Sequence, residues 1–418
     1  MREERTEVLV VGAGPVGLLT AILLAEAGIE VKIIDQEERT TARSYACALH
    51  PRTLKLLAAM GLAAPVLEQG RRIDTVAFYD GQARQAEVKL SELGGEFPFM
   101  VILPQNILEE VLERRLRQAG VAVGWGYRFD DLEYATVGVT AIVEELGATG
   151  TGYIVPHWEM VVKQRFPIRA QFLVGADGYG SLVRQRLGIT NTRVVGPQFF
   201  AAYEFEPETP ADGEVRVVLD QPTTNVLWPL PGDRCRWTFQ VVKGGGPREF
   251  PEKERREARF TQANVDEHIR QYVEKVAKQR APWFAWGVKQ ITWCTEVVFE
   301  QRVAGQLGRE RCWLVGDAAH QTGPVGVQSM NVGMSEAAAL TGALRRILRE
   351  KAPPNLLDAW SREWQEEWRR LLGMTGGLKP RNETSAWVRE RRDRILACLP
   401  ASDQDLARLA GQLRTDGP

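Results

Sequence analysis

The sequence predicts an α/β protein with a Rossmann-like nucleotide-binding domain, an inserted mixed β-sheet and a helical C-terminal tail. Three observations support this fold class. A G-x-G-x-x-G motif separates an apolar strand-like run from an apolar helix near the N-terminus. Apolar and polar residues alternate over residues 191–243, as in strands that are half buried. The segment after Pro353 and Pro354 is charged and helical in pattern.

The first motif is a strand, a tight turn and a helix. Residues 7–11 form a short apolar run rich in β-branched side chains, and residues 18–27 form an apolar helix. Gly12, Gly14 and Gly17 lie between and at the start of these elements. We expect Gly12 to allow the turn, Gly14 to let backbone N–H groups approach a pyrophosphate, and Gly17 to let the helix pack on the strand.

An acidic residue completes this motif. A second strand over residues 30–34 leads to Asp35, 18 residues after Gly17. A carboxylate at this position is suited to bind the hydroxyls of an adenosine ribose and repels a 2′-phosphate. Pro15 is compatible with the helix start because the first-turn N–H groups have no intrahelical partner. The whole arrangement predicts a dinucleotide-binding site.

Composition limits the classes of function. The 418 residues are 44% hydrophobic, enough for two or three packed units. The formal charge of −1 gives no overall basic surface, so nucleic acid and anionic membrane are not indicated as partners.

The cysteines and the first residues indicate the cellular environment. The five cysteines are scattered and show no C-x-x-C spacing, which argues against a disulfide framework, a zinc site and a redox-active dithiol. The chain enters its first strand without a signal-peptide pattern, and no apolar segment is long enough to cross a bilayer. We therefore expect a cytoplasmic protein without stable membrane insertion.

Periodicity predicts the remaining elements. We expect helices over residues 51–60, 104–120, 252–278 and 327–350, and strand-rich segments over residues 71–99, 121–169, 191–243 and 296–316. In the tail, Trp360, Trp364 and Trp368 recur every fourth residue and so share one helix face. Core or interface packing is our interpretation of these tryptophans.

Two later motifs also carry chemistry. Residues 172–184, FLVGADGYGSLVR, place Asp177 after an apolar strand, and residues 313–320, WLVGDAAH, do the same with Asp317. A carboxylate at a strand end beside small residues suits a polyol chain, whose hydroxyls need an acceptor and a close backbone. The ribityl chain of FAD is such a polyol.

These three motifs, in this order, resemble the group A flavoprotein monooxygenases, the para-hydroxybenzoate hydroxylase family, over about residues 6–350. The resemblance implies a Rossmann-like FAD-binding domain of the GR2 type with an inserted mixed β-sheet substrate domain. It also implies FAD as cofactor, NADPH or NADH as transient reductant, and O₂ as co-substrate. The implied reaction is hydroxylation of an aromatic or polyketide-like small molecule through a flavin C4a-hydroperoxide, by a monomer or homodimer.

The domain boundaries follow from this resemblance. We expect a discontinuous FAD-binding domain over residues 1–70, 101–190 and 291–350, and a substrate-binding domain over residues 71–100 and 191–290. Residues 351–418 are expected to form a C-terminal helical region.

The resemblance also implies roles for single residues. Asp317 binds ribityl and pyrophosphate, Gln105 reaches the ribityl side, and Arg43 lies near the flavin. Asp177 is associated with both FAD and the nicotinamide cofactor. The expected cofactor-binding set is Gly12, Gly14, Pro15, Val16, Gly17, Asp35, Gln36, Arg43, Gln105, Asp177, Gly316, Asp317, Pro324, Gly326, Val327, Gln328, Ser329, Met330 and Asn331.

The loop before residue 327 departs from the family pattern. The family has P-x-G-G-Q-G-M-N, whereas this chain has PVGVQSMN, with Val327 and Ser329 in place of two glycines. These side chains bear on how freely a flavin can move. A helix starting here points its positive end toward the preceding site, where a reduced flavin carries negative charge.

The central steps need no protein acid, base or nucleophile, because the flavin performs the chemistry. The candidate pocket residues are His50, Tyr45, Trp228, His320 and Pro324. Two alternatives stay open at this point: a reductase or halogenase-like enzyme of the same fold, and a non-catalytic flavin-binding protein. The halogenase pattern W-x-W-x-I-P is absent, and no second G-x-G-x-x-G is present.

Overall fold

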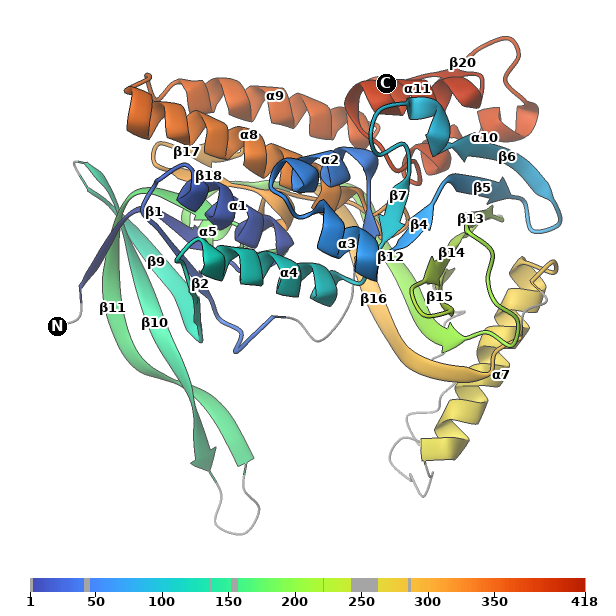
Figure 1. The fold of residues 1–418 in the computed structure, drawn as a ribbon, viewed down its shortest axis with the longest axis horizontal. Helices are drawn as coiled ribbons and strands as arrows, with labels where there is room; N and C mark the ends of the chain where they lie inside the picture. The colour runs from blue at the N-terminus through green and yellow to red at the C-terminus, as the bar shows by residue number, and fades with distance from the viewer. Residues whose placement is uncertain are drawn as a thin grey trace.

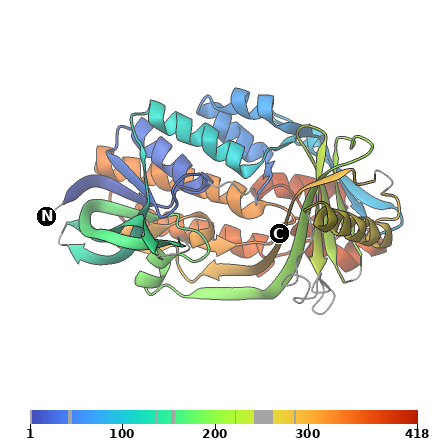
Figure 2. The same ribbon diagram turned by 90° about the horizontal axis from the view of Figure 1, so that it is seen from below.

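Two eight-stranded sheets organise the chain and lie toward opposite ends of its long axis (Figures 1 and 2). A computed structural model describes residues 3–40, 46–135, 137–151, 157–220, 222–241, 262–284 and 287–417. Within these residues, no helix is both long enough and apolar enough to pass through a bilayer.

The first sheet is the Rossmann-like one. Its central strands are parallel in the order β18-β11-β1-β2-β8, and β10 and β9 extend it as an antiparallel arm from β11. Its strands are β1 (Glu4–Val11), β2 (Val31–Asp35), β8 (Val123–Trp125), β9 (Tyr127–Ala135), β10 (Gly138–Thr151), β11 (His157–Gly175), β17 (Gly308–Arg309) and β18 (Cys312–Leu314). The predicted strand, helix and second strand near the N-terminus are confirmed.

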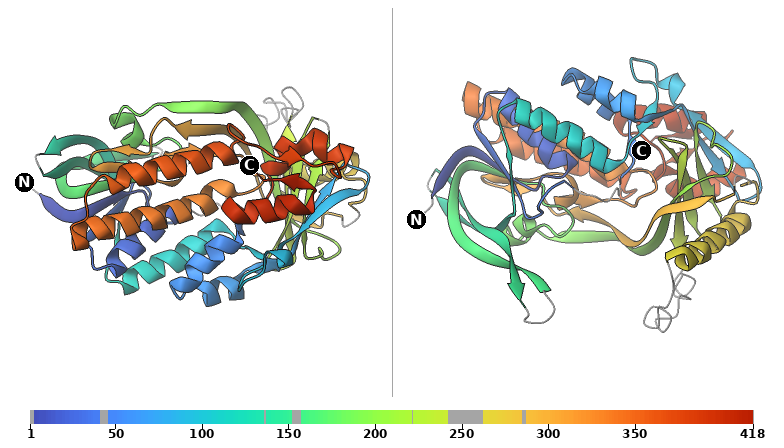
Figure 3. Two further views of the ribbon diagram at one scale, coloured as in Figure 1. Left: turned by 90° about the horizontal axis from the view of Figure 1, so that it is seen from above. Right: turned by 60° about the horizontal axis from the view of Figure 1, so that its bottom comes forward.

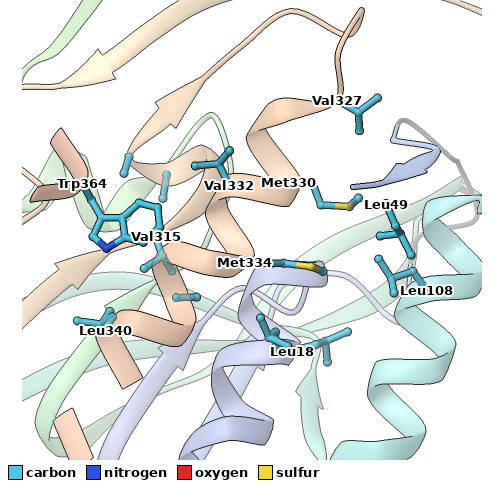
Figure 4. Close-up of a cluster of buried hydrophobic side chains, with 14 of the residues drawn as sticks. Leu18, Leu49, Leu108, Val315, Val327, Met330, Val332, Met334, Leu340 and Trp364 are labelled. Atoms are coloured by element: carbon cyan, nitrogen blue, oxygen red, sulfur yellow. The ribbon is translucent and has the colours of Figure 1, made fainter. Parts of the chain in front are cut away.

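Helices cover this sheet side by side (Figure 3). They are α1 (Pro15–Glu26), α4 (Gln105–Gln118), α8 (Gln328–Glu350) and α9 (Leu356–Leu371). The central strands are apolar on both faces because they are covered on both, and Val8, Leu9 and Val10 are fully buried. α8 lies at the centre of the core, where Met330 and Met334 approach Leu18 of α1 and Leu108 of α4 (Figure 4).

The second sheet has the order β19-β16-β12-β15-β14-β13-β5-β6. Its strands are β5 (Thr75–Tyr79), β6 (Arg84–Lys89), β12 (Asn191–Glu206), β13 (Glu214–Leu219), β14 (Thr224–Leu230), β15 (Arg234–Val241), β16 (Gln290–Ala304) and β19 (His320–Gln321). The alternating pattern of the sequence is confirmed: Ala201, Tyr203 and Phe205 face a separate apolar cluster that includes α7 (Gln262–Arg280), whereas Phe200 joins the main core.

Two predictions agree with the structure only in part. The helix expected over residues 252–278 is present as α7 from Gln262, and residues 242–261 lie outside the described residues. β16, which the sequence division places with the first unit from residue 291 onward, hydrogen-bonds to β12 in the second sheet. This long strand carries the chain from one sheet back to the other.

Shorter elements connect these layers. They are β3 (Ala48–Leu49), α2 (Pro51–Ala59), α3 (Ala63–Gln69), β4 (Arg71–Ile73), η1 (Leu90–Leu93), β7 (Met100–Ile102), α5 (Leu182–Arg186) and η3 (Gly316–Ala318). The tail after α9 contains β20 (Lys379–Pro380), α10 (Ala386–Leu396), α11 (Asp403–Gln412) and β21 (Thr415–Asp416). The tryptophan face of α9 packs in the core, as predicted, and Trp360, Trp364 and Trp368 are buried.

Candidate functional site

The site lies where the parallel strands end. In the register of the sheet, Val11 stands beside Ile34 and Gly175, and Gly175 stands beside Leu314. The residues that follow these strand ends therefore meet at one edge of the sheet, where open α/β sheets bind their ligands. Four segments that are far apart in sequence come together here: the turn at residues 12–17, Asp35, Asp177 and the pair Gly316 and Asp317.

The three glycines of the turn differ in what requires them. At Gly12, with φ of +105°, a Cβ atom would overlap the backbone of Ala176, and at Gly17 it would overlap the carbonyl oxygen of Gly12. At Gly14 no protein atom lies within 4 Å of the Cβ position, and φ is an ordinary −69°. The fold itself therefore requires Gly12 and Gly17, whereas the open space at Gly14 leaves room for a ligand at the N-terminus of α1.

Asp35 closes the turn from the side. Its Oδ2 accepts a hydrogen bond from the Ala13 N–H at 2.6 Å, and its Oδ1 accepts one from the Glu37 N–H at 2.9 Å. Because a carboxylate has about four lone-pair sites, capacity remains for ribose hydroxyls. Asp35 is half buried and the neighbouring Gln36 is exposed, so both are accessible from the groove.

Asp317 lies in η3 and its side chain is exposed. Protein surrounds this position closely, and the resulting desolvation raises the pKa of Asp317, while a hydrogen bond from Ser329 acts in the opposite direction. From this accessible carboxylate and the open space at Gly14 we infer a groove at this edge of the sheet, called the strand-end groove below. The acceptor oxygens of Asp317 fit the hydroxyls of a ribityl chain.

Asp177 has a local structural function that its motif did not reveal. It accepts hydrogen bonds from Ser181 Oγ at 2.6 Å and from the Val183 N–H at 3.1 Å, so both carboxylate oxygens hold the start of α5. Burial raises the pKa of Asp177. Arg184 of the same helix donates to the carbonyl of Ala318 at 2.7 Å and thereby joins the A-D-G and G-D-A-A-H segments.

The loop before α8 is held by its own side chains. Ser329 Oγ accepts from the Thr322 N–H at 2.9 Å, and the Ser329 N–H donates to Thr322 Oγ1 at 3.2 Å. Val327 adopts the left-handed conformation, with φ of 51°, which is unfavourable for a β-branched residue. Ser329 thus joins the two ends of the loop by hydrogen bonds, and Val327 carries the unfavourable backbone conformation.

Other residues of this segment bind protein groups. His50 Nε2 lies 2.9 Å from the Gly326 carbonyl, and the His50 N–H donates to Asn331 Oδ1 at 2.8 Å. Asn331 Nδ2 donates to the carbonyls of Ala48 and Val327. These bonds fasten the loop to α2, and they place His50 beneath the loop at 3% exposure.

Two glutamines that were predicted to bind the cofactor form hydrogen bonds with other residues of the chain. Gln328 is buried, and its amide donates to the carbonyls of Leu396 and Leu399 in and after α10. Gln105 Oε1 accepts from the Ala46 N–H at 3.1 Å, and its Nε2 donates to Glu109. Both side chains thus bind protein groups, and their contact with a cofactor stays a prediction.

The structure places the remaining predicted residues as follows. Pro15 and Val16 lie in the first turn of α1, with Val16 partly exposed, and Met330 is buried in the first turn of α8. Trp228 is buried on β14, and Pro324 is half buried. Arg43 and Tyr45 lie outside the described residues.

A cavity of about 320 Å³ adjoins the loop. Its volume lies within the range of small-molecule sites. Polar and apolar side chains of the second sheet, the loop and α10 line it: Gln198, Phe200, Thr224, Gln240, Gln301, Gly323, Val325, Arg394 and Leu396. His50, His320 and Trp228 do not line this cavity, whereas Pro324 stands between two residues that do.

Sequence reasoning missed Glu336. This acid is fully buried on α8 and accepts a hydrogen bond from the Gly316 N–H at 3.0 Å and one from His320 Nε2 at 2.8 Å. A signal existed in the sequence, because Glu336 is the one acid in the apolar stretch over residues 330–344. A charged residue in such a stretch must find partners.

A second missed pair lies on the inner face of the second sheet. Arg236 donates through Nε to Glu204 Oε1 at 3.0 Å, and both residues are buried. The Arg236 guanidinium lies over the ring of Trp293, 5.5 Å from the ring centroid. Glu204 of β12 and Arg236 of β15 stand opposite each other in the sheet, and this pairing depends on strand register, which periodicity does not determine.

The fold and the strand-end groove define the class of protein: a Rossmann-like protein with a dinucleotide site formed by three separate motifs. Comparison with protein families identifies it further. Residues 5–373 match the FAD binding domain family, and the chain belongs to this family.

Curated relatives support this assignment. The chain is 30% identical over 374 residues to a 6-methylpretetramide 4-monooxygenase from Streptomyces rimosus, covering 88% of this chain and 61% of that protein. It is 28% identical over 379 residues to a pentachlorophenol 4-monooxygenase from Sphingobium chlorophenolicum, covering 89% and 64%. The chain therefore spans about three fifths of the length of these relatives.

Solved structures share the fold. A p-nitrophenol 4-monooxygenase from Pseudomonas putida superposes with a TM-score of 0.72 at 22% identity, over 95% of this chain and 94% of that one. An aklavinone-11 hydroxylase in complex with FAD and aklavinone superposes with a TM-score of 0.70 at 22% identity, over 95% and 71%. At this level of identity the likeness concerns the fold.

Proposed function

We propose that this protein is an FAD-dependent monooxygenase that uses NADH or NADPH and O₂ to hydroxylate an aromatic or polyketide-like small molecule. The observation that carries the proposal is the open space at Gly14 together with the exposed Asp317 carboxylate, since both follow strand ends at the same edge of the sheet. The monooxygenase names of the relatives agree with it.

In this proposal the strand-end groove holds the cofactor. The N–H groups at the start of α1 bind the pyrophosphate, with Gly14 allowing close approach. Asp35 accepts from the adenosine ribose, and Asp317 accepts from the ribityl chain. FAD, when bound, supplies hydride acceptance and oxygen activation.

The protein's own part is to bind, orient and exclude water. α8 begins at Gln328, and the positive end of this helix would stabilise negative charge on a flavin bound next to the preceding loop. His50, Ser329 and Thr322 hold the preceding loop in one conformation. Pro324 forms part of the wall between groove and cavity.

The cavity beside this loop is the proposed substrate site. Phe200, Val325 and Leu396 offer apolar surface for a ring, and Gln198, Gln240 and Gln301 offer amide groups for ring substituents. The proposed division is an FAD-binding domain over residues 1–70, 101–190 and 291–350 and a substrate-binding domain over residues 71–100 and 191–290. Residues 351–418 then form a C-terminal region that closes the cavity through α10.

The test begins with the purified protein. We expect it to be yellow, to release about one FAD per chain on denaturation, and to oxidise NADH or NADPH slowly alone and faster with a suitable member of a panel of phenols and hydroxylated polycyclic aromatics. With ¹⁸O₂, the product should contain one ¹⁸O atom.

Three outcomes contradict the proposal in different ways. Release of FMN, or no flavin after reconstitution with FAD, overturns the cofactor assignment. Bound flavin that neither nicotinamide cofactor reduces indicates a non-catalytic flavin-binding protein. A product that forms equally well without oxygen indicates a reductase of the same fold.

A further inference from the structure

Glu336 is the centre of a fully buried hydrogen-bond network. Its Oε2 accepts from the Gly316 N–H at 3.0 Å and from His320 Nε2 at 2.8 Å. Its Oε1 accepts from the indole Nε1–H of Trp368 at 3.1 Å. A second tryptophan of α9, Trp360, donates its Nε1–H to the backbone carbonyl of Glu336 at 3.2 Å.

The indole of Trp368 also holds the histidine of this network. The rings of His320 and Trp368 stack with centroids 3.4 Å apart and an angle of 21° between planes. Where Glu336 is a carboxylate it only accepts hydrogen bonds, and the proton of the His320–Glu336 bond then lies on His320 Nε2. Trp368 therefore orients both the carboxylate and the imidazole that contacts it.

Because the network is buried, each of these hydrogen bonds is needed to stabilise the Glu336 carboxylate. Glu336 and Trp368 are 0% exposed, and a buried carboxylate is strongly unfavourable unless its oxygens are satisfied. Removing one of the three donors leaves part of that charge without a partner, so the remaining donors must shift toward it. One of those remaining donors is the backbone N–H of Gly316.

Gly316 sets the position of Asp317. It has a φ of +61°, and a Cβ atom there would lie 3.2 Å from the side chain of Val16 in α1. Gly333 of α8 also packs against it, and a Cβ atom added at Gly333 would lie 3.1 Å from the Gly316 Cα. A small displacement of the Gly316 N–H thus moves the Asp317 carboxylate in a tightly packed place.

We propose that Trp368 and Glu336 are positioning residues for FAD: the indole fixes the Glu336 carboxylate, which fixes Gly316 and so holds Asp317 against the ribityl chain. This inference rests on the proposed FAD site. It gives the tryptophan face of α9 a function beyond core packing, because a helix outside the groove contributes to cofactor affinity through one buried acid.

The chain offers a matched control on the same helix face. The Nε1–H of Trp364 is buried and has no hydrogen-bond partner among the described residues. Trp368→Phe and Trp364→Phe are therefore the same substitution in similar surroundings, but only the first removes a bond to Glu336. We expect Trp368→Phe to weaken FAD binding about tenfold, as for loss of one hydrogen bond to a charged group, and Trp364→Phe to change it less than about twofold.

The measurement is the Kd of FAD for each apoprotein, from quenching of flavin fluorescence, with the thermal midpoint of the apoprotein beside it. If the tryptophans act only through packing, both variants should show a lower thermal midpoint of the apoprotein. FAD affinity should then fall by an amount that matches the loss of stability in each variant. Positioning instead predicts a loss of affinity that is non-additive with Asp317→Asn: in that background Trp368→Phe should have little further effect.

Glu336→Gln is the second variant, in case Trp368→Phe folds poorly. It keeps the shape but replaces an acceptor oxygen by an NH₂ donor, and it should weaken FAD binding by at least tenfold and alter the absorption spectrum of the bound flavin. Equal Kd values for the two tryptophan variants, or full additivity with Asp317→Asn, overturn the inference while FAD binding by the parent protein still supports the proposed function. If the parent protein binds no FAD, the proposed function fails first and the inference fails with it.

Discussion

The fold does not require a glycine at position 14, whereas a ligand bound at the start of α1 would require one. Its backbone angles suit any amino acid, and its Cβ position is empty in the protein. Gly12 and Gly17 have no such freedom, because their hydrogen atoms face backbone carbonyls. Comparison of these glycines gives a direct test of the groove.

We expect Gly14→Ala to fold as well as the parent protein, with a thermal stability equal or slightly higher, since alanine reduces the freedom of the unfolded chain. Its FAD affinity should fall at least tenfold, because the methyl group occupies the approach to the pyrophosphate. Fluorescence titration and thermal denaturation of the apoprotein measure the two quantities. Gly17→Ala, the control, should lose stability even without FAD, and parental affinity in Gly14→Ala would show that the groove has been misassigned.

His50 is a residue whose titration affects stability. Burial lowers its pKa from 6.5 to about 4, so His50 stays neutral in the folded protein. Between these two pH values the unfolded chain binds the proton and the folded protein does not. The free energy of unfolding therefore falls as pH falls from about 6.5 to about 4, and it recovers as pH rises, by about 3 kcal/mol over the full window.

The expected result is a difference between pH profiles. Urea unfolding at pH 7.5 and pH 4.5 should show a smaller loss of stability at low pH in His50→Gln than in the parent, because glutamine can donate to the Gly326 carbonyl without titrating. His268→Gln, a change at an exposed position, should keep the parental profile. Parallel profiles for His50→Gln and the parent would contradict a neutral, buried His50.

At the scale of elements, α8 is fastened to the tail at its first residue. The Gln328 amide donates to the carbonyls of Leu396 and Leu399 at 3.2 Å and 3.1 Å. A Cβ atom at Gly326 would overlap the carbonyl of Ala397, so the loop and the end of α10 are in direct contact. The loop beside the cavity and the end of α10 are therefore packed against each other, and hydrogen bonds join α8 to the same segment.

We expect Gln328→Leu to loosen α10. Two amide–carbonyl hydrogen bonds are lost and two buried carbonyls lose a donor, at a cost of about 2 kcal/mol. Hydrogen exchange should become faster in α10 and at residues 396–399. Gln412→Leu in α11, whose bonds to Lys89 are exposed to water, is the control and should change exchange in α10 very little; unchanged exchange in Gln328→Leu would show that the tail is held by other contacts.

The sequence predicted helix starts best, because the residues that begin a helix lie within the helix or directly before it. α1 and α8 begin within about three residues of the predicted starts because glycine, proline and apolar periodicity act locally. The side-chain bonds of the same elements could not be predicted in this way. His50 meets the carbonyl of Gly326, which lies 276 positions further along the chain, and no local pattern encodes that distance.

At the scale of the whole molecule, the three motifs were sufficient to predict the family and the two-part α/β architecture, because each motif is a strand end with a defined chemical environment. The Glu336 network was not predictable from them. It joins Gly316, His320 and Trp368 from three elements, and its geometry depends on how α9 packs over α8. The hydrogen-bond partners of Glu336 are determined by tertiary packing, which local sequence patterns do not show.

The order of the strands in the first sheet also determines when the site can exist during synthesis. β1 lies between β2 and β11, and β11 in turn pairs with β18, whose end carries Asp317. A ribosome that adds 5 to 20 residues per second needs roughly 15 to 60 s to proceed from Gly14 to Asp317. During this interval β1 and α1 leave the ribosome, yet α8, which packs against α1, has not been made. The proposed flavin site is therefore completed late in synthesis, because Asp317 is the last of its segments to be made.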